Sequence, residues 1–150
     1  MLNLLKMILA APEGSPGETP PPEVVVCAVL LEAAEADHEV SPDERALIFG
    51  HLQRSFGLDT PQAEAVMAET HRWRTNAADA WPFTTAIRRQ FDQDQKKELL
   101  VMIWRILLSD KRLSAEEELW ARRLRDMLAV NHSLLMDAKR QAREEIERDA

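Results

Sequence analysis

Cysteine, glycine and tyrosine are scarce in this sequence. It holds one cysteine, Cys27, four glycines and no tyrosine in 150 residues. One thiol cannot form an intrachain disulfide or a cysteine-rich zinc site. The sequence contains no G-x-S-x-G motif, no glycine-rich phosphate loop and no H-E-x-x-H pair, so the signatures of several common enzyme classes are missing. We therefore predict a protein that is not an enzyme.

Positive charge is also in short supply. Nineteen lysines and arginines stand against 26 aspartates and glutamates, which gives a net charge of −7. Binding to nucleic acid depends on neutralising phosphates, so this balance disfavours it. The longest apolar run, Val24–Leu31, is far shorter than the roughly 18–20 residues that cross a bilayer. The N-terminus lacks the basic region of a signal peptide. We expect a cytoplasmic protein with little tendency to contact membranes.

Proline divides the chain unevenly. Residues 12–22 hold five of the eight prolines and two of the four glycines, a composition typical of a linker. Residues 1–11 precede it and form a predicted amphipathic helix that is too short to be stable alone. This helix is expected to dock on the body or to exchange between two copies in a homodimer. Residues 23–150 are predicted to form a single domain.

The body of the chain has the periodicity of helices. Apolar residues recur at helical spacing and no segment alternates with period two, so the fold class is all-α with about seven helices. Val24, Val25 and Val26 leave a strand open as the alternative for the first segment. Thr60 is the predicted cap of the third helix. The expected helices are 23–36, 42–56, 60–76, a short one after 82, 94–108, which is apolar nearly all round and therefore central, 115–128, and one from 133 onwards.

An acidic first half precedes a basic middle. Residues 23–70 have a net charge of −8 and residues 71–114 have +4. The middle carries Arg72, Trp73, Arg74, Arg88 and Arg89, and an aromatic side chain among guanidinium groups suits an acidic protein partner. The alternative is that these charges only solvate the surface or attract the acidic half.

A weak internal repeat relates two turns. Residues 37–44 align with residues 110–117, and after a one-residue slip residues 56–59 align with 128–131. Ser41 with Glu44, and Ser114 with Glu117, both have the spacing of a capping box, in which the serine and the glutamate satisfy each other's backbone N–H groups. Ser41 and Ser114 are therefore predicted helix caps, and the repeat predicts two helical hairpins with pseudo-two-fold symmetry.

The same turns are also candidates for binding a divalent cation. Clustered carboxylates are the ligands that hard cations such as calcium prefer. Neither turn has the 12-residue loop of an EF-hand or its glycine. Capping alone and a cation site both remain open. The candidate ligands are Asp37, Glu39, Glu44, Asp110 and Glu117.

These motifs carry a family resemblance. Residues 36–45 resemble the A-D-G-x-x-S-x-x-E turn of the TerB-like tellurite-resistance family, and residues 109–117 resemble its second copy. That family includes the N-terminal domain of a membrane-anchored J-domain co-chaperone. The likeness covers about residues 24–140, with His38 and Lys111 where glycine is usual. It implies an all-helical domain, a link to tellurite or other stress responses, and an acidic cluster proposed to bind metal. We therefore expect a non-enzymatic module that senses or scaffolds, or one that only binds proteins.

Overall fold

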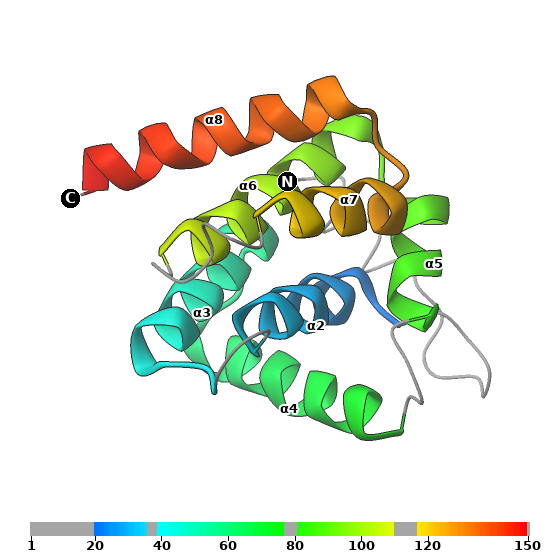
Figure 1. Cartoon of the computed structure of the whole chain (residues 1–150). Coiled ribbons are helices and arrows are strands. Elements are labelled where there is room, and N and C mark those ends of the chain that lie inside the picture. Colours follow the sequence, from blue (N-terminus) through cyan, green and yellow to red (C-terminus); the bar gives the residue numbers. More distant parts are fainter. Residues whose placement is uncertain (1–19, 36–38, 77–80, 110–116, 150) are drawn as a thin grey trace. The chain divides into compact units, whose positions relative to one another are not determined.

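The described part of the chain is helical apart from short connecting segments. The computed structural model describes residues 20–35, 39–76, 81–109 and 117–149, although the side chains of residues 81, 82, 109, 117 and 118 are not described. No strand occurs in these ranges, which confirms the all-α prediction. The helices are α2 (Pro22–Glu35), α3 (Pro42–Phe56), α4 (Thr60–Asn76), α5 (Trp81–Gln90), α6 (Gln93–Ser109), α7 (Glu117–Leu128) and α8 (His132–Asp149) (Figure 1).

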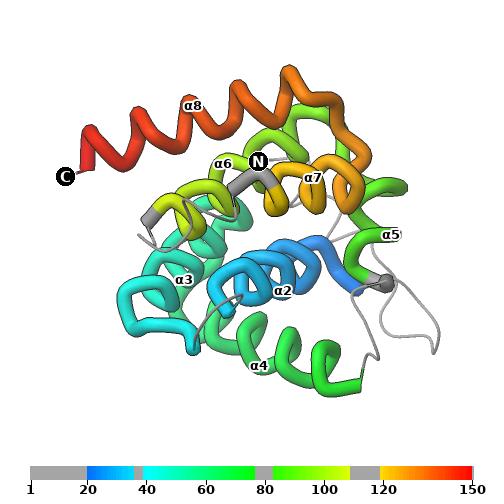
Figure 2. The backbone as a smooth tube through the Cα atoms, viewed as in Figure 1, coloured from blue at the N-terminus to red at the C-terminus, as the bar shows by residue number. Residues whose placement is uncertain are grey.

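The chain forms two compact units, which consist of residues 1–86 and residues 87–150. In the first unit α2 packs against both α3 and α4, and α3 and α4 form a hairpin (Figure 2). In the second unit α6 packs along α8, which also contacts α7. Helix α5 spans the boundary between them. The repeat seen in the sequence thus corresponds to two units that each contain three long helices.

Helix α2 is the buried helix of the first unit. Eleven of its fourteen residues are buried, so the valines at its start pack as core side chains in a helix, not in a strand. The carbonyl of Pro21 accepts hydrogen bonds from the N–H groups of Val24 and Val25, both at 3.0 Å. Pro22 is the first helical residue, where a missing N–H has no cost. The predicted linker therefore ends one residue inside this helix.

Helix α6 has the same place in the second unit. Trp104 is fully buried, and the Nζ of Lys139 on α8 lies 5.3 Å from its ring centroid. Arg105 reaches α8 as well, with Nη1 3.2 Å from Glu145 Oε1 and Nη2 2.8 Å from Asp149 Oδ2. The burial of α6 agrees with the prediction that residues 94–108 form a central helix.

The start of α4 differs from the prediction in its cap. The carboxylate of Asp59 accepts the N–H of Gln62 at 2.8 Å, and the Gln62 side chain accepts the N–H of Asp59 at 2.9 Å. Asp59 therefore caps this helix, and the assignment of Thr60 as the cap was wrong. Aspartate and threonine are both good caps, but only Asp59 has a partner three residues on that can complete a capping box.

The turn after α3 recurs after α7, 72 residues later. Gly57 lies in the left-handed region with φ 63°, and the N–H of Leu58 donates to the carbonyl of Gln53 at 3.1 Å. Ala129 has φ 53°, and the N–H of Val130 donates to the carbonyl of Arg125 at 3.3 Å. Both are Schellman endings.

The next residue caps the following helix in both copies. Asp59 does so before α4, and the side chain of Asn131 accepts the N–H of Leu134 at 2.8 Å before α8. The repeat is therefore structural as well as sequential in this part of the chain, because both copies share the ending of one helix and the start of the next.

Several predictions fall on residues that the structure does not describe. The helix over residues 1–11, its exchange between copies and most of the linker over 12–22 stay predictions. So does the pseudo-two-fold arrangement of the two units. Among the described helices, none combines the length and the apolar character needed to cross a membrane.

The two left-handed positions are expected to respond oppositely to exchange of glycine and alanine. A Cβ on Gly57 would meet no atom within 4 Å, so Gly57→Ala adds only backbone strain and lowers the free energy of unfolding by about 1 kcal/mol. Ala129→Gly relieves the same strain and raises it by roughly 0.5–1 kcal/mol. Urea unfolding followed by circular dichroism measures both. Changes of the same sign in the two variants would contradict the shared turn geometry.

Candidate functional site

The first acidic turn is a capping box in the structure. The N–H of Ser41 donates to Glu44 Oε1 at 3.0 Å, and the N–H of Glu44 donates to Ser41 Oγ at 3.1 Å. Ser41 has the extended backbone of an N-cap, and Pro42 follows at the first helical position. These contacts satisfy two N–H groups that the helix itself leaves unpaired. One carboxylate oxygen of Glu44 is therefore engaged in holding the start of α3.

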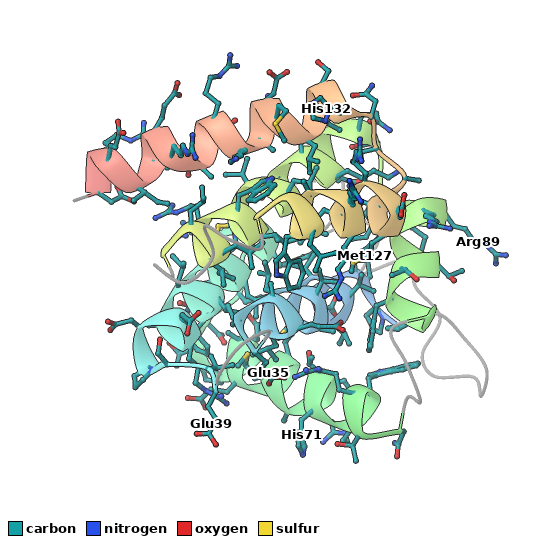
Figure 3. The ribbon with its side chains drawn as sticks, viewed as in Figure 1. Glu35, Glu39, His71, Arg89, Met127 and His132 are labelled. Atoms are coloured by element: carbon teal, nitrogen blue, oxygen red, sulfur yellow. The ribbon has the colours of Figure 1, made fainter. Side chains whose placement is uncertain are left out.

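The other acids at this turn have different surroundings. Glu44 is buried, whereas Glu39 and Asp43 are exposed. Figure 3 shows Glu39 pointing away from the ribbon. Exposed carboxylates beside the positive end of a helix are stabilised by its dipole. Glu39 and Asp43 are thus accessible to a ligand from solution, and Glu44 is accessible only if its cap contact changes.

Most of the predicted cation ligands cannot be assembled from the described residues. Asp37, Asp110 and the predicted cap Ser114 lie outside the described ranges. Glu117 is the first residue of α7, but its side chain is not described. Within the ranges that are described, no three His, Cys, Asp or Glu side chains gather as a metal site would require. Whether these turns bind a cation stays a prediction.

Two further capping boxes use glutamine where α3 uses glutamate. Gln62 completes the box of α4, and Gln95 completes that of α6 by accepting the N–H of Asp92 at 2.8 Å. The amide oxygen of glutamine can therefore perform the capping role within this chain. Capping alone does not require the negative charge of Glu44, so a substitution can separate the cap from the charge.

Two of the arginines predicted to bind a partner are paired within the first unit. Arg74 of α4 donates from Nη1 and Nη2 to the two carboxylate oxygens of Glu35 on α2, at 3.1 and 2.6 Å. This hydrogen bonding holds the pKa of Glu35 below its usual value. Arg72 donates to Glu69, one turn earlier on α4. Trp73 between them is half-buried.

The other two predicted arginines lie at the end of α5. Arg88 donates to the backbone carbonyls of Asp126 and Met127 in the last turn of α7, with Nε 3.4 Å from the oxygen of Met127. Arg89 is exposed and projects away from the helix (Figure 3). The five residues of the predicted partner site therefore belong to two different units. Their role in binding a partner is untested.

The sequence did not lead us to predict one group of neighbouring side chains on α7. The guanidinium of Arg123 lies over the ring of Trp120, 5.5 Å from its centroid, and Leu119 beside it is 49% exposed. The spacing of Trp120 and Arg123, three residues apart, places them on one helix face. That spacing was visible in the sequence, but which face of the helix is exposed was not.

Cys27 is buried among apolar atoms of the first unit. Its Sγ donates to Sδ of Met67 on α4 at 3.4 Å. Burial raises the pKa of the thiol to about 11, although hydrogen bonding to Thr70 opposes the shift. A thiol with such a pKa is a poor nucleophile and a poor metal ligand near neutral pH. Cys27 is therefore an inert core residue.

Glu23 is a half-buried residue with one buried carboxylate oxygen. Its Oε2 is buried and has no hydrogen-bond partner, and burial raises its pKa. It lies in the first turn of α2, where the helix dipole favours a negative charge. We infer that Glu23 has a structural role at the start of α2.

Comparison with known proteins adds one finding. A family model described as tellurite resistance protein TerB matches residues 23–140. The match covers most of the chain and both acidic turns. No curated protein and no solved structure matches the chain.

The thiol of Cys27 is expected to react slowly in the native protein. At pH 8 a thiol with a pKa of about 11 has at least about 100-fold less thiolate than an unperturbed cysteine. Reaction with Ellman's reagent, followed at 412 nm, should be slow in buffer and rapid in guanidinium chloride. Cys27→Ala supplies the blank. Equal rates in the two solvents would mean that the thiol is neither buried nor shifted.

Proposed function

Because the chain belongs to the TerB family of tellurite resistance proteins, we propose that it is a non-enzymatic scaffold in a stress response of that kind. Such a scaffold acts by holding partner proteins on its surface. The observation that carries this proposal is the unequal charge of the two units. The first unit has five basic and thirteen acidic residues, a net charge of −8, and the second has fourteen and thirteen, a net charge of +1.

Because the two related units differ in net charge, we expect them to bind partner proteins of different charge. The two units share a helix ending and a helix start, so the packing that forms them makes similar demands on their cores. Packing does not require their surfaces to differ by nine charges. Surface charge instead governs which proteins are attracted and at what rate they associate. This supports a scaffold whose first unit favours basic partners.

The contacts at the acidic turn support the same proposal. Glu44 and Ser41 are engaged with each other, and glutamine takes the place of glutamate in the two related capping boxes. These acids thus have a structural reason to be present. The exposed acids elsewhere on the first unit, Glu32 on α2 and Glu64 on α4, have no such role at a helix start and are available to a partner.

Charge reversal on the first unit is expected to remove function without unfolding the protein. In a host strain that lacks its own copy of the gene, Glu32→Lys with Glu64→Lys should fail to restore tellurite tolerance, because a basic partner would be repelled. The matched control is Glu144→Lys with Glu147→Lys, two exposed acids on α8. The control should restore tolerance. Full tolerance with both pairs, at equal protein levels, would contradict the scaffold proposal.

A second candidate function is binding of a divalent cation at the first acidic turn. Glu39 and Asp43 favour it, because both carboxylates are exposed beside a fixed helix start. Carboxylates in that position are suitable oxygen ligands for calcium. In this case the cation would regulate the module by bridging the acids at the start of α3.

Thermal melting of chelator-treated protein with a panel of divalent cations tests this candidate. A cation at ~100 times its dissociation constant should add about 2.7 kcal/mol of stability. Glu44→Gln keeps the capping box but removes one charge, so its melt without cations should stay near that of the wild type while the cation response falls. Ser41→Ala serves as the comparison, because it should cost ~1 kcal/mol with or without cations. If no cation in the panel shifts the melting temperature, the cation site is contradicted and these acids act only at the helix start.

A further inference from the structure

Arg88 brings a positive charge to the C-terminal end of α7. Its guanidinium donates to the carbonyls of Asp126 and Met127, which are among the carbonyls that a helix end leaves unpaired. This contact stabilises the negative end of the helix dipole. It engages no carboxylate, so the full charge of Arg88 remains on an exposed side chain. Figure 3 labels Met127 in this last turn.

Arg123 adds a second guanidinium, restrained by a cation–π contact. Its guanidinium carbon lies over the ring of Trp120, 5.5 Å from the centroid, and such a contact uses the charge without engaging a carboxylate. The N–H groups of arginine form a fork that binds a carboxylate through two parallel hydrogen bonds. Arg123 is an exposed side chain, so this fork is a candidate for an acidic ligand.

Four other arginines of the described residues are engaged differently. Arg72, Arg74, Arg105 and Arg140 each lie within ion-pair distance of a carboxylate of their own unit. Arg88 and Arg123 instead contact carbonyl oxygens and an aromatic ring. These two therefore keep more of their attraction for an outside carboxylate. Arg122 and Arg125 on the same helix add to the positive potential, and Asp126 is the acidic side chain between them and the helix end.

An apolar side chain completes this surface. Leu119 is the exposed large hydrophobic residue of the described chain, at 49%, and it precedes Arg123 by four residues, which places the two on one face of α7. Arginine is enriched at the energetic centre of protein interfaces, and Leu119 offers an apolar contact beside it, while the ring of Trp120 is itself buried. We define the arginine surface as Arg88 of α5 with Leu119, Arg122, Arg123 and Arg125 of α7.

We propose that the arginine surface binds an acidic segment of another protein, in which an apolar side chain lies one helical turn from the carboxylates. The inference rests on the proposed scaffold function and assigns the second unit its own partner chemistry. The carboxylates bind the fork of Arg123, and the apolar side chain packs on Leu119. Charge complementarity with the arginines favours an acidic ligand, and the exposed side chain of Leu119 favours a protein that can supply an apolar side chain to pack on it.

Fluorescence anisotropy with a defined probe tests the proposal on the full chain. The probe is a labelled synthetic peptide of glutamates with leucines at helical spacing. Arg123→Glu should raise its Kd by about tenfold or more. Arg140→Glu, an exposed arginine of α8 in the same unit, gives the same change in net charge and should alter Kd less than about twofold. Equal losses in both variants would overturn the proposal in favour of non-specific attraction.

A conservative variant separates geometry from charge. Arg123→Lys keeps the positive charge but lacks the planar fork, so it should weaken binding by about threefold or more. Unchanged binding would overturn the role of the fork. Superimposable thermal melts of all three variants would show that folding is intact.

The same proteins allow two other ligands of the arginine surface to be tested, duplex DNA and a second copy of this chain. Tighter binding of duplex DNA than of the peptide at equal salt would overturn the proposal in favour of nucleic acid. Sedimentation of the protein alone as a dimer that Arg123→Glu dissociates would overturn it in favour of a second copy. The peptide assay tests only the arginine surface of the second unit, whereas the tellurite-tolerance assay tests the acidic first unit. A failure of this inference can therefore be distinguished from a failure of the scaffold proposal.

Discussion

Unpaired backbone N–H groups at helix starts determine where many polar side chains of this chain lie. An all-helical chain has many such starts, and each leaves up to four N–H groups without an intrahelical partner. Ser41, Asp59, Asp92 and Asn131 accept these groups at the starts of α3, α4, α6 and α8. The buried helix α2 packs against α3 and α4, and the buried helix α6 packs against α8, and the starts of these three neighbours are capped in this way. A cluster of acidic residues in this sequence is therefore explained first by the helix start that it caps.

This constraint explains what could be predicted. The apolar periodicity predicted the helices and most of their boundaries, and Trp104 and Trp120 lie within these helices as buried side chains. The spacing of Ser41 and Glu44 was sufficient to predict a capping box. The cap of α4 was not predicted, because Thr60 followed by Pro61 also fits a helix start. The spacing of Asp59 and Gln62 fits a capping box and would have favoured Asp59, as the hydrogen bonds show.

The candidate site was less predictable for a different physical reason. Whether a charged side chain is available depends on what lies across from it, and residues 39 positions apart meet only in the fold. Arg74 is paired with Glu35 of α2, and Arg88 lies on the end of α7. Arg123, which sequence reasoning passed over, is presented on Trp120. A count of basic residues gives the sign of a surface, but the ion pairs decide which of its charges can act.

The left-handed turn after α7 affects local opening as well as overall stability. Ala129 holds a conformation that Gly57 adopts in the first unit without penalty. A difference of about 1 kcal/mol corresponds to roughly a fivefold change in the population of an opened state. The strain at Ala129 thus favours opening of the turn before α8, compared with the same turn carrying a glycine. In hydrogen-exchange terms, this residue lowers the protection of amides at the start of α8, although the helix packs along the buried helix α6.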